Sequence, residues 1–402
     1  MDKKVTSKYL LLNFLKIGAT SFGGFLALVS VIQDQMVSRD KTIKNELILD
    51  GISLASVLPG PLAVNVVTYI GYHLKGIKGA LLSMMAVILP SFMLVLGLSW
   101  FYFKYGSLPV VDKTFSGIMP AVVAIIVIVA IRMARKSVSD YKQWIICVVS
   151  GLLLICFGGF FATLGLIVAG GITGAALYYK KKTHKEFSES LPIRKQINIP
   201  YLVLSVLGAG IIAILFIPRI VPAGMQDFFM DIRKLLVVFS GMSLTLFGGG
   251  YVFIPAIQET VVENLHWLSV REFADGIAIG QITPGPILIS ATFIGYKVAG
   301  IGGAFVATVA IFLPSGILMI AGSHFLEKFK KSNLVKSIFM GLRPAVIGLI
   351  FAASFTIAQS ITISWQSILI FLLIFLINFK YNVNAAILIP VSGILGIIMF
   401  SI

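Results

Sequence analysis

The chain has 402 residues, of which 58% are hydrophobic and 12% are charged, and its formal net charge is +16. Soluble domains contain about 25% charged residues, so this composition excludes an ordinary soluble protein and indicates that the bilayer is the solvent. The Lys and Arg residues fall between apolar runs, as in cytoplasmic loops of membrane proteins, so we do not expect nucleic-acid binding.

Apolar runs in chain order predict an all-α polytopic membrane protein. The uncharged run 79–103, for example, is long enough to cross about 30 Å of hydrocarbon as a helix. The first half has segments near 10–32, 47–72, 79–103, 114–134, 143–159 and 161–179. The second half has segments near 235–257, 273–296, 300–323, 338–358, 363–379 and 383–401. One connecting segment near 200–217 brings the prediction to about 13 membrane segments.

The two halves are related in sequence, at a spacing of 224 or 225 residues. Tyr69–Ala80 and Phe293–Ala304 are identical at seven of twelve positions. Shared membrane composition would match Leu, Ile and Val, but it would not keep Gly and Pro in register. The pairs in register include Phe22-Gly23-Gly24 with Phe247-Gly248-Gly249, Asp50-Gly51 with Asp275-Gly276, Pro59-Gly60-Pro61 with Pro284-Gly285-Pro286, and Leu89-Pro90-Ser91 with Leu313-Pro314-Ser315. We therefore expect a first repeat at 1–179, a basic linker with a connecting span at 180–232, and a second repeat at 233–402.

Basic loops predict the orientation of the chain in the inner, cytoplasmic membrane. Lys and Arg collect in Arg132–Lys142, Lys180–Pro200 and Glu327–Lys336, so these loops are expected inside. The halves then have inverted topology, which is typical of secondary transporters. The acidic segment Glu259–Glu272 conflicts with this scheme because it would face the cytoplasm. The number of crossings changes if the second element of each half is a re-entrant hairpin. The N-terminus shows no cleavable signal peptide.

The two Pro-Gly-Pro segments are the strongest candidates for a binding site. Pro59-Gly60-Pro61 and Pro284-Gly285-Pro286 interrupt apolar stretches, where proline removes a backbone donor and glycine permits unusual conformations. Broken backbone at membrane depth is tolerated in protein or beside water. The helices that restart after each break would direct free N–H groups and a positive dipole end toward an anion. The alternative is a structural kink.

The two glycine-rich segments, with nearby polar and charged side chains, complete the candidate site. The predicted substrate-binding residues are Lys16, Gly23, Gly24, Ser56, Pro59, Gly60, Pro61, Asn65, Gly248, Gly249, Gln281, Thr283, Pro284, Gly285, Pro286 and Arg343. The glycines can instead serve close helix packing, and the two cations can extend to an interface. Asp50 and Asp275 are candidates for proton coupling, with helix capping or pairing as the alternative.

The combined motifs resemble the chromate ion transporters in their long, two-domain form. The resemblance rests on Phe-Gly-Gly followed by Gln33-Asp34 or Gln258-Glu259, on both Pro-Gly-Pro segments, on IGY…G-I-x-G-A, and on Leu-Pro-Ser. It covers nearly the whole chain and implies an efflux carrier for chromate driven by the proton motive force. It also implies sulfate as a competing anion of the same shape. Lys16 stands where the second half has Gly241, so a cation there is not shared by the halves.

Three alternatives belong to other functional classes or substrates. A carrier for another small oxyanion such as sulfate would use the same N–H groups. An intramembrane enzyme or lipid-handling protein is disfavoured because the chain lacks H-E-x-x-H, G-x-S-x-G, a P-loop lysine motif and a Cys/His cluster. A channel is disfavoured because broken, inverted halves favour alternating access. We expect no cofactor or metal; the partners are the oxyanion, membrane lipid and, if the chain pairs, a second copy in a homodimer.

Overall fold

The computed structural model describes residues 5–22, 24–106, 108–179, 226–245, 250, 253–323, 332–359 and 361–401. All regular secondary structure in these ranges is helical. The helices are α1 (Ser7–Thr20), α2 (Gly24–Ile32), η1 (Gln33–Arg39), α3 (Asn45–Ala55), α4 (Leu62–Tyr105), α5 (Pro109–Ser137), α6 (Tyr141–Phe157), α7 (Phe160–Tyr178), α9 (Gln226–Thr245), α10 (Phe253–Gln258), η4 (Glu259–Asn264), α11 (Val270–Ile282), η5 (Ile287–Ile289), α12 (Ser290–Gly322), α14 (Asn333–Gln359), α15 (Trp365–Tyr381) and α16 (Ala385–Met399). The predicted linker 180–200 and connecting segment 200–217 lie outside the described residues.

Five helices of the described chain are long and apolar enough to cross a membrane, and their outer faces are suited to lipid. They are α4, α5, α7, α12 and α14, and the shorter α6, α15 and α16 are also apolar. Large apolar side chains such as Met85, Phe157 and Trp365 are more than half exposed. A soluble monomer rarely exposes contiguous apolar surface of this kind, so these faces are the lipid-facing surface of a multi-pass membrane protein.

Helices α4 and α12 each consist of two helices folded back on one another. In α4 the reversal lies at Lys75 (φ −141°) and Gly76 (φ 62°), and in α12 it lies at Ala299 (φ −144°) and Gly300 (φ 57°). Across the second turn, the side-chain hydroxyls of Thr292 and Thr308 are 2.7 Å apart. A straight helix would separate these residues by about 24 Å, so each element is an αα-hairpin.

The segments 47–72 and 273–296, predicted as single spans, are also hairpins. Helix α3 ends at Ala55 and α4 begins at Leu62, and the Pro-Gly-Pro segment forms the tip between them. Gly51 of α3 packs against Tyr69 of α4, and Gly276 of α11 packs against Phe293 of α12. The two arms of each hairpin therefore lie side by side in opposite directions. The sequence left a single span and a hairpin open, because proline and glycine show where a helix stops but not where the chain then turns, and the structure has the hairpin.

The predicted segment 10–32 is likewise divided into two arms. The Tyr9 hydroxyl donates to Asp40 (2.6 Å), and the Lys16 ammonium donates to Gln35 (3.3 Å). These contacts join α1 to η1 and the loop after it in antiparallel order, with the tip near Phe22. In the equivalent segment 235–257, α9 ends at Thr245 and α10 begins at Phe253, and residues 246–249, 251 and 252 lie outside the described residues.

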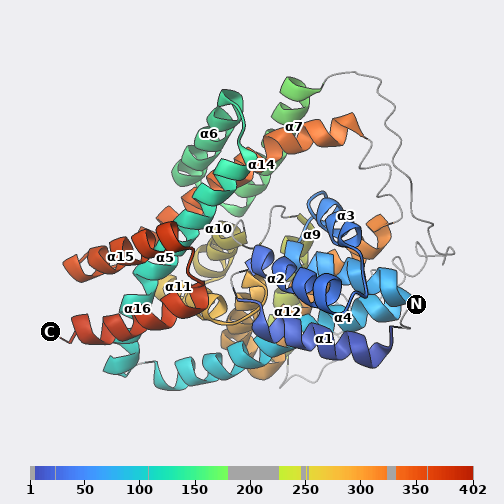
Figure 1. Ribbon diagram of the computed structural model, residues 1–402. Helices are drawn as coiled ribbons and strands as arrows, with labels where there is room; N and C mark the ends of the chain where they lie inside the picture. Colours follow the sequence, from blue (N-terminus) through green and yellow to red (C-terminus); the bar gives the residue numbers. More distant parts are fainter. Residues whose placement is uncertain are drawn as a thin grey trace.

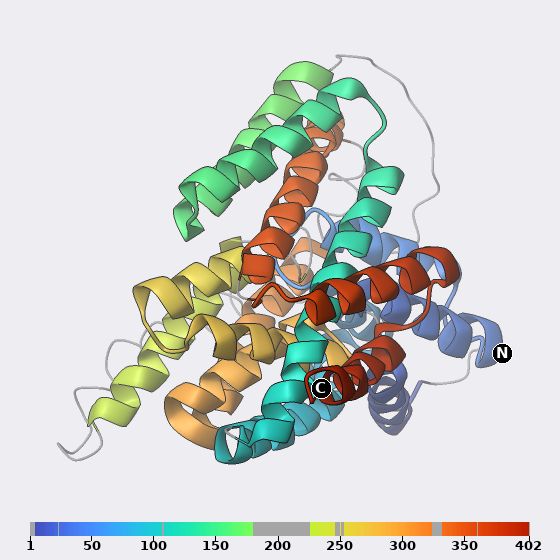
Figure 2. The same cartoon turned by 90° about the vertical axis from the view of Figure 1, so that its left-hand side faces the viewer.

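The halves exchange their outer helices. Helix α5 of the first half packs against α15 and α16 of the second, while α14 of the second half packs against α6 and α7 of the first. Figures 1 and 2 show both groups, with α6, α7 and α14 together at the top of Figure 1. Glycines set the closest approaches, because a Cβ on Gly117 would overlap α16 and a Cβ on Gly341 would overlap α7.

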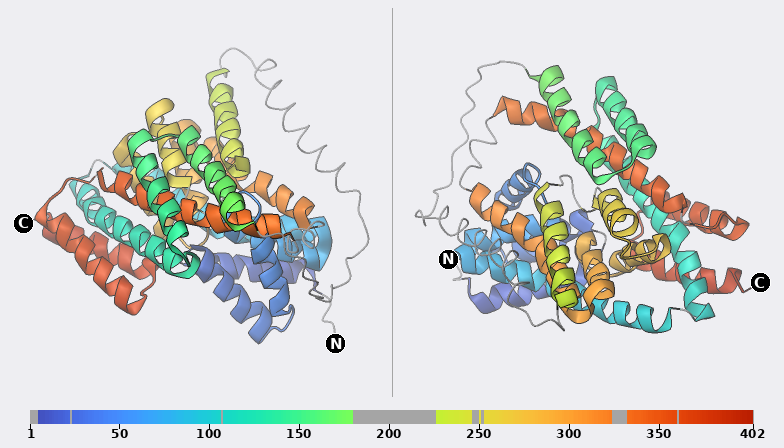
Figure 3. Two further views of the ribbon diagram at one scale, coloured as in Figure 1. Left: turned by 90° about the horizontal axis from the view of Figure 1, so that it is seen from above. Right: turned by 180° about the vertical axis from the view of Figure 1, so that it is seen from behind.

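The hairpins that contain the breaks pack on one another and contact the two outer groups through α10 and α11. Helix α1 packs on α4, α9 packs on α12, and α4 and α12 pack on each other. Figure 3 shows α9 alongside α12 in both of its views. The two halves therefore meet through the same elements on both sides. The inverted orientation in the bilayer and the number of crossings remain predictions.

Candidate anion site at the helix breaks

Each Pro-Gly-Pro segment forms a buried turn that requires glycine. Gly60 has φ +103° and Gly285 has φ +106°, and both residues are buried. Side chains with a Cβ rarely adopt such φ values, whereas glycine does so freely. Pro61, with φ −69°, then sets the entry into α4. The two segments thus share one conformation at equivalent positions.

Each turn is seated against the Leu-Pro-Ser segment of the other half. A Cβ on Gly60 would overlap Ser315, and a Cβ on Gly285 would overlap Ser91. The Ser91 hydroxyl donates to the Pro284 carbonyl, which holds the second turn in place. These contacts are reciprocal, because Gly60 and Ser91 occupy the repeat positions of Gly285 and Ser315. Reciprocal contacts of this kind are those of an isologous, two-fold interface.

The glycine-rich tips meet the second Pro-Gly-Pro turn. The Gly285 N–H donates to the Ser21 carbonyl at 2.7 Å. The side chain of Ile287 lies 3.3 Å from a Cβ built on Gly24 and 3.0 Å from one built on Gly250, so a side chain at either position would crowd Ile287. The predicted site residues Gly23, Gly248 and Gly249 lie outside the described residues.

Two buried polar side chains follow the breaks at equivalent positions. Asn65 donates from Nδ2 to the Pro59 carbonyl (3.2 Å), and its Oδ1 is buried without a hydrogen-bond partner. Ser290 is 1% exposed, and its Oγ is also without a partner. Buried polar atoms are nearly always hydrogen-bonded, so both atoms are candidates for a ligand contact, but only the Ser290 hydroxyl can donate to an anion, because the Asn65 amide oxygen accepts.

The other predicted polar groups satisfy their own backbone or are simply buried. The Ser56 hydroxyl donates to the Ser53 carbonyl (2.8 Å), and the Thr283 hydroxyl donates to the Gly280 carbonyl (3.1 Å). Gln281 is 6% exposed. The hydroxyls of Ser56 and Thr283 therefore brace the arms of the hairpins and are less suited to bind a ligand than the Ser290 hydroxyl.

The break residues are uncharged, so their electrostatics come from backbone dipoles. The first N–H groups of α4, from Leu62 onward, have no partner within the helix, and the turn η5 begins the second restart in the same way. Such ends carry a partial positive charge, which favours an anion and does not require a buried cation. The arrangement can therefore bind an oxyanion through N–H and hydroxyl donors.

The two cations predicted near the site do not contact the breaks. Lys16 is exposed and donates to Gln35. Arg343 is exposed and lies over the ring of Phe339, 5.9 Å from its centroid. The prediction placed them by sequence position alone, and their directions on α1 and α14 place both side chains elsewhere.

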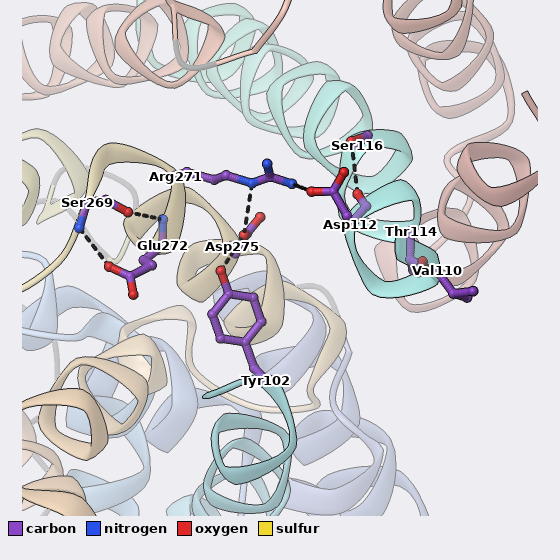
Figure 4. A network of polar contacts seen from close by, with 9 residues as sticks. All are labelled: Tyr102, Val110, Asp112, Thr114, Ser116, Ser269, Arg271, Glu272 and Asp275. Carbon is purple, nitrogen blue, oxygen red and sulfur yellow. Dashed lines mark hydrogen bonds and ion pairs between the residues drawn. The ribbon is translucent and has the colours of Figure 1, made fainter. Parts of the chain in front are cut away.

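A second polar cluster lies around Asp275 (Figure 4). Asp275 is 1% exposed; its Oδ2 accepts from the Tyr102 hydroxyl at 2.6 Å and lies 3.9 Å from Nε of Arg271. Arg271 also pairs with Asp112 of α5. Asp275 Oδ1 is buried without a hydrogen-bond partner, and the residue lines a cavity of about 130 Å³ between α5, α11 and α15.

The equivalent aspartate of the first half lies in a different environment. Asp50 is half-buried on α3 and close enough to His73 to interact electrostatically. Arg271 is replaced by Glu46 at the equivalent position of α3. The repeat therefore conserves the carboxylate but not its partners.

Sequence reasoning missed several residues that shape the two clusters. Ser91 and Ser315 were visible as part of a repeated Leu-Pro-Ser, and that repetition in register was the available signal. Tyr102 and Asp112 carried no such signal, because they reach Asp275 and Arg271 only across the folded interface between the halves.

A family profile described as "Chromate transporter" matches this chain at residues 8–175 and again at 233–397. A chromate transport protein of Cupriavidus metallidurans is 28% identical over 397 residues, covering 98% of this chain and 94% of the relative. An uncharacterized transporter of Methanocaldococcus jannaschii is 28% identical over 387 residues, covering 96% of this chain and 92% of the relative.

A shorter relative matches part of the chain. An uncharacterized transporter of Bacillus subtilis is 30% identical over 166 residues, covering 40% of this chain and 93% of its own length. No solved structure matches the chain significantly.

Proposed function

The chain belongs to the chromate transporter family, and from this premise we propose that it exports chromate across the inner membrane, driven by the proton motive force. Family membership itself supports a role in chromate transport, and the apolar helices support a multi-pass membrane protein. The direction of transport, its coupling and its site are our proposals.

The observation that carries the proposal is the reciprocal seating of the two Pro-Gly-Pro turns. It places two helix restarts in the buried interior of the molecule, and the second is followed by the unpartnered hydroxyl of Ser290, which can donate to an anion. Discontinuous helices with their positive ends at the substrate are typical of secondary transporters. We propose that the anion binds there, between the two halves.

We propose a topology in which the Pro-Gly-Pro hairpins and the α1–η1 hairpin are re-entrant. A re-entrant α3–α4 hairpin returns Lys75 and Lys78 to the cytoplasm, as basic loops require. The inverted second half then places the acidic segment Glu259–Glu272 outside, which removes the conflict found with single spans. Reporters placed after Lys182 and after Ile402 should lie on opposite sides; finding both on one side would exclude this topology.

We propose that Asp275 carries the coupling proton. It is a buried carboxylate with one unpartnered oxygen beside a polar cavity, and such groups in membrane segments commonly mark proton pathways. Asp275→Asn should abolish acceleration of transport by a pH gradient while leaving exchange of labelled for unlabelled anion. Gradient-driven transport at the normal rate would exclude this role.

Sulfate remains the alternative substrate, because it is a dianion of similar size and tetrahedral shape. Inverted membrane vesicles should take up labelled chromate, and an uncoupler should stop the uptake. Labelled sulfate measured in parallel decides between the two anions. If neither anion moves, the proposed substrate is wrong; if uptake is insensitive to the uncoupler, the proposed coupling is wrong.

A further inference from the structure

The two halves differ at one pair of equivalent interfaces. Helix α11 packs against α5 and α16, whereas α3, its counterpart, packs mainly on α4 and makes no comparable contact with α14 in the described part of the chain. As a result, Leu49 of α3 is 52% exposed, while Ala274 at the same position of α11 is 1% exposed. The interface of α11 with α5 and α16 is therefore closed, whereas the equivalent interface of α3 with α14 is open.

The closed interface is joined by an ion pair whose counterpart has reversed signs. Arg271 of α11 pairs with Asp112 of α5. The repeat aligns Arg271 with Glu46 of α3, and it aligns Asp112 with Lys336 of α14. Three residues further on, both halves have a phenylalanine, Phe115 and Phe339. Each position carries the opposite charge in the other half, yet the two members of each pair still attract one another. Common ancestry of the two halves does not by itself require this.

The counterpart pair is not formed in this structure. Glu46 and Lys336 are both exposed, and neither side chain is within 4.0 Å of an opposite charge in the described residues. They belong to the two helices, α3 and α14, that are separated here. Opposite charges on two separated helices are expected to pair when the helices come together.

We infer that Glu46 and Lys336 form the ion pair that closes the α3 side when the Arg271–Asp112 pair opens. The two pairs are alternate gates, and the structure shows one state of the exchange. This inference rests on the proposed function, because alternating access requires two such states. The proposed topology puts the Glu46–Lys336 gate on the cytoplasmic side, so the state seen here admits anions from the cytoplasm.

Arg343 adds a second exposed cation to α14 beside Lys336. It lies within the apolar helix α14, two turns beyond Lys336, and its side chain is exposed, whereas the equivalent Met119 is 7% exposed against the closed side. An arginine within a membrane-embedded helix faces water or protein, because exposure to lipid is costly. The exposed face of α14 that carries Lys336 and Arg343 is therefore positively charged, and its two cations attract anions.

The gate can be tested by crosslinking, without measuring transport. Glu46→Cys and Lys336→Cys are combined in a chain whose two native cysteines, Cys147 and Cys156, are replaced by serine. A protease site is inserted in the linker 180–200, and membranes are treated with a short bifunctional thiol reagent. After denaturation and cleavage, a crosslink keeps the two halves together on a gel.

Two further cysteine pairs calibrate the result. Arg271→Cys with Asp112→Cys, in contact in the structure, should crosslink readily. Ser53→Cys with Lys336→Cys is the matched control, because Ser53 is half-buried on the same helix and lies about 10 Å further along α3 than Glu46. We expect the 46–336 yield to exceed the 53–336 yield several-fold. Equal or reversed yields would overturn the gate, whichever anion is transported.

A charge exchange tests whether attraction is what closes the gate. Glu46→Lys should slow transport about fivefold, the effect of losing about 1 kcal/mol at an exposed pair. Adding Lys336→Glu should restore the rate, and high salt should weaken both effects. Lack of rescue, with the double variant still present in the membrane, would refute the pairing. If crosslinking succeeds but neither chromate nor sulfate moves, the gate stands and the proposed substrate fails.

Discussion

The two Pro-Gly-Pro turns are predicted to respond differently to relief of their steric contacts. Gly60→Ala and Gly285→Ala each introduce a Cβ at a φ near +105°, which costs about 1–3 kcal/mol of backbone strain. Each also creates an overlap with a serine of the other half, which costs about 1–3 kcal/mol more. The sum is large enough to disturb the site in both variants.

The structure specifies which second substitution relieves each overlap. The new Cβ at position 285 overlaps only the hydroxyl of Ser91, whose own Cβ is 3.4 Å away, so Ser91→Ala should remove that contact. The new Cβ at position 60 overlaps the Cβ of Ser315 and also lies 2.6 Å from its hydroxyl, so only Ser315→Gly should suffice. The backbone strain remains in both double variants.

Double-mutant cycles on the free energy of unfolding, measured by SDS titration in mixed micelles, separate the overlap from the strain. We expect coupling of about 1–3 kcal/mol for Gly285→Ala with Ser91→Ala and for Gly60→Ala with Ser315→Gly, and less for Gly60→Ala with Ser315→Ala. Equal coupling for the last two pairs, or none in any, would refute the reciprocal seating of the turns.

Three smaller predictions concern the outer helices. Tyr178 donates to both carboxylate oxygens of Asp140 and holds the pKa of Asp140 below its usual value. This stabilisation is therefore present above about pH 4 and is lost as the pH falls through the pKa of the folded state. The melting temperature of Asp140→Asn should change less on acidification than that of the native chain. Gly117→Leu should destabilise the protein by about 3 kcal/mol in SDS titration by displacing α16, while Gly97→Leu, with open space around its Cβ, should be nearly neutral. Arg132→Met should cost about 1.5 kcal/mol, because its guanidinium donates to the main chain and a side chain of α15, and an unchanged midpoint would exclude this role.

The positions of the helices were largely predictable, because the bilayer demands apolar runs of a set length and helices that satisfy their own backbone. The breaks at Gly60 and Gly285 were predictable for a local reason, since proline and glycine act on their immediate neighbours. The reversal of the chain after each break was not predictable. It depends on contacts such as Gly51 with Tyr69, which form between arms and leave no periodic pattern.

The backbone breaks of the candidate site were predictable from the sequence, but the side chains that contact the site from the other half were not. The repeat suggested that Asp50 and Asp275 share a role, yet only Asp275 is buried beside a tyrosine and an arginine. The repeat compares positions within a half, whereas Tyr102 reaches Asp275 from the other half. Ser91 and Ser315 were visible in the repeat, but their contacts with the Pro-Gly-Pro turns were not, because those contacts also cross the interface between the halves.

The exchange of outer helices has a consequence for how the chain is made. Helix α5 is synthesised early, but the helices that cover it, α15 and α16, are synthesised only after all the other described helices. Until then the close-packing surface at Gly117 is without its protein partner and must be held in lipid or by an insertion factor. The two halves cannot mature one after the other, so a chain that stops before Trp365 should be recognised by quality-control proteases as incomplete, although most of its helices are already in the membrane.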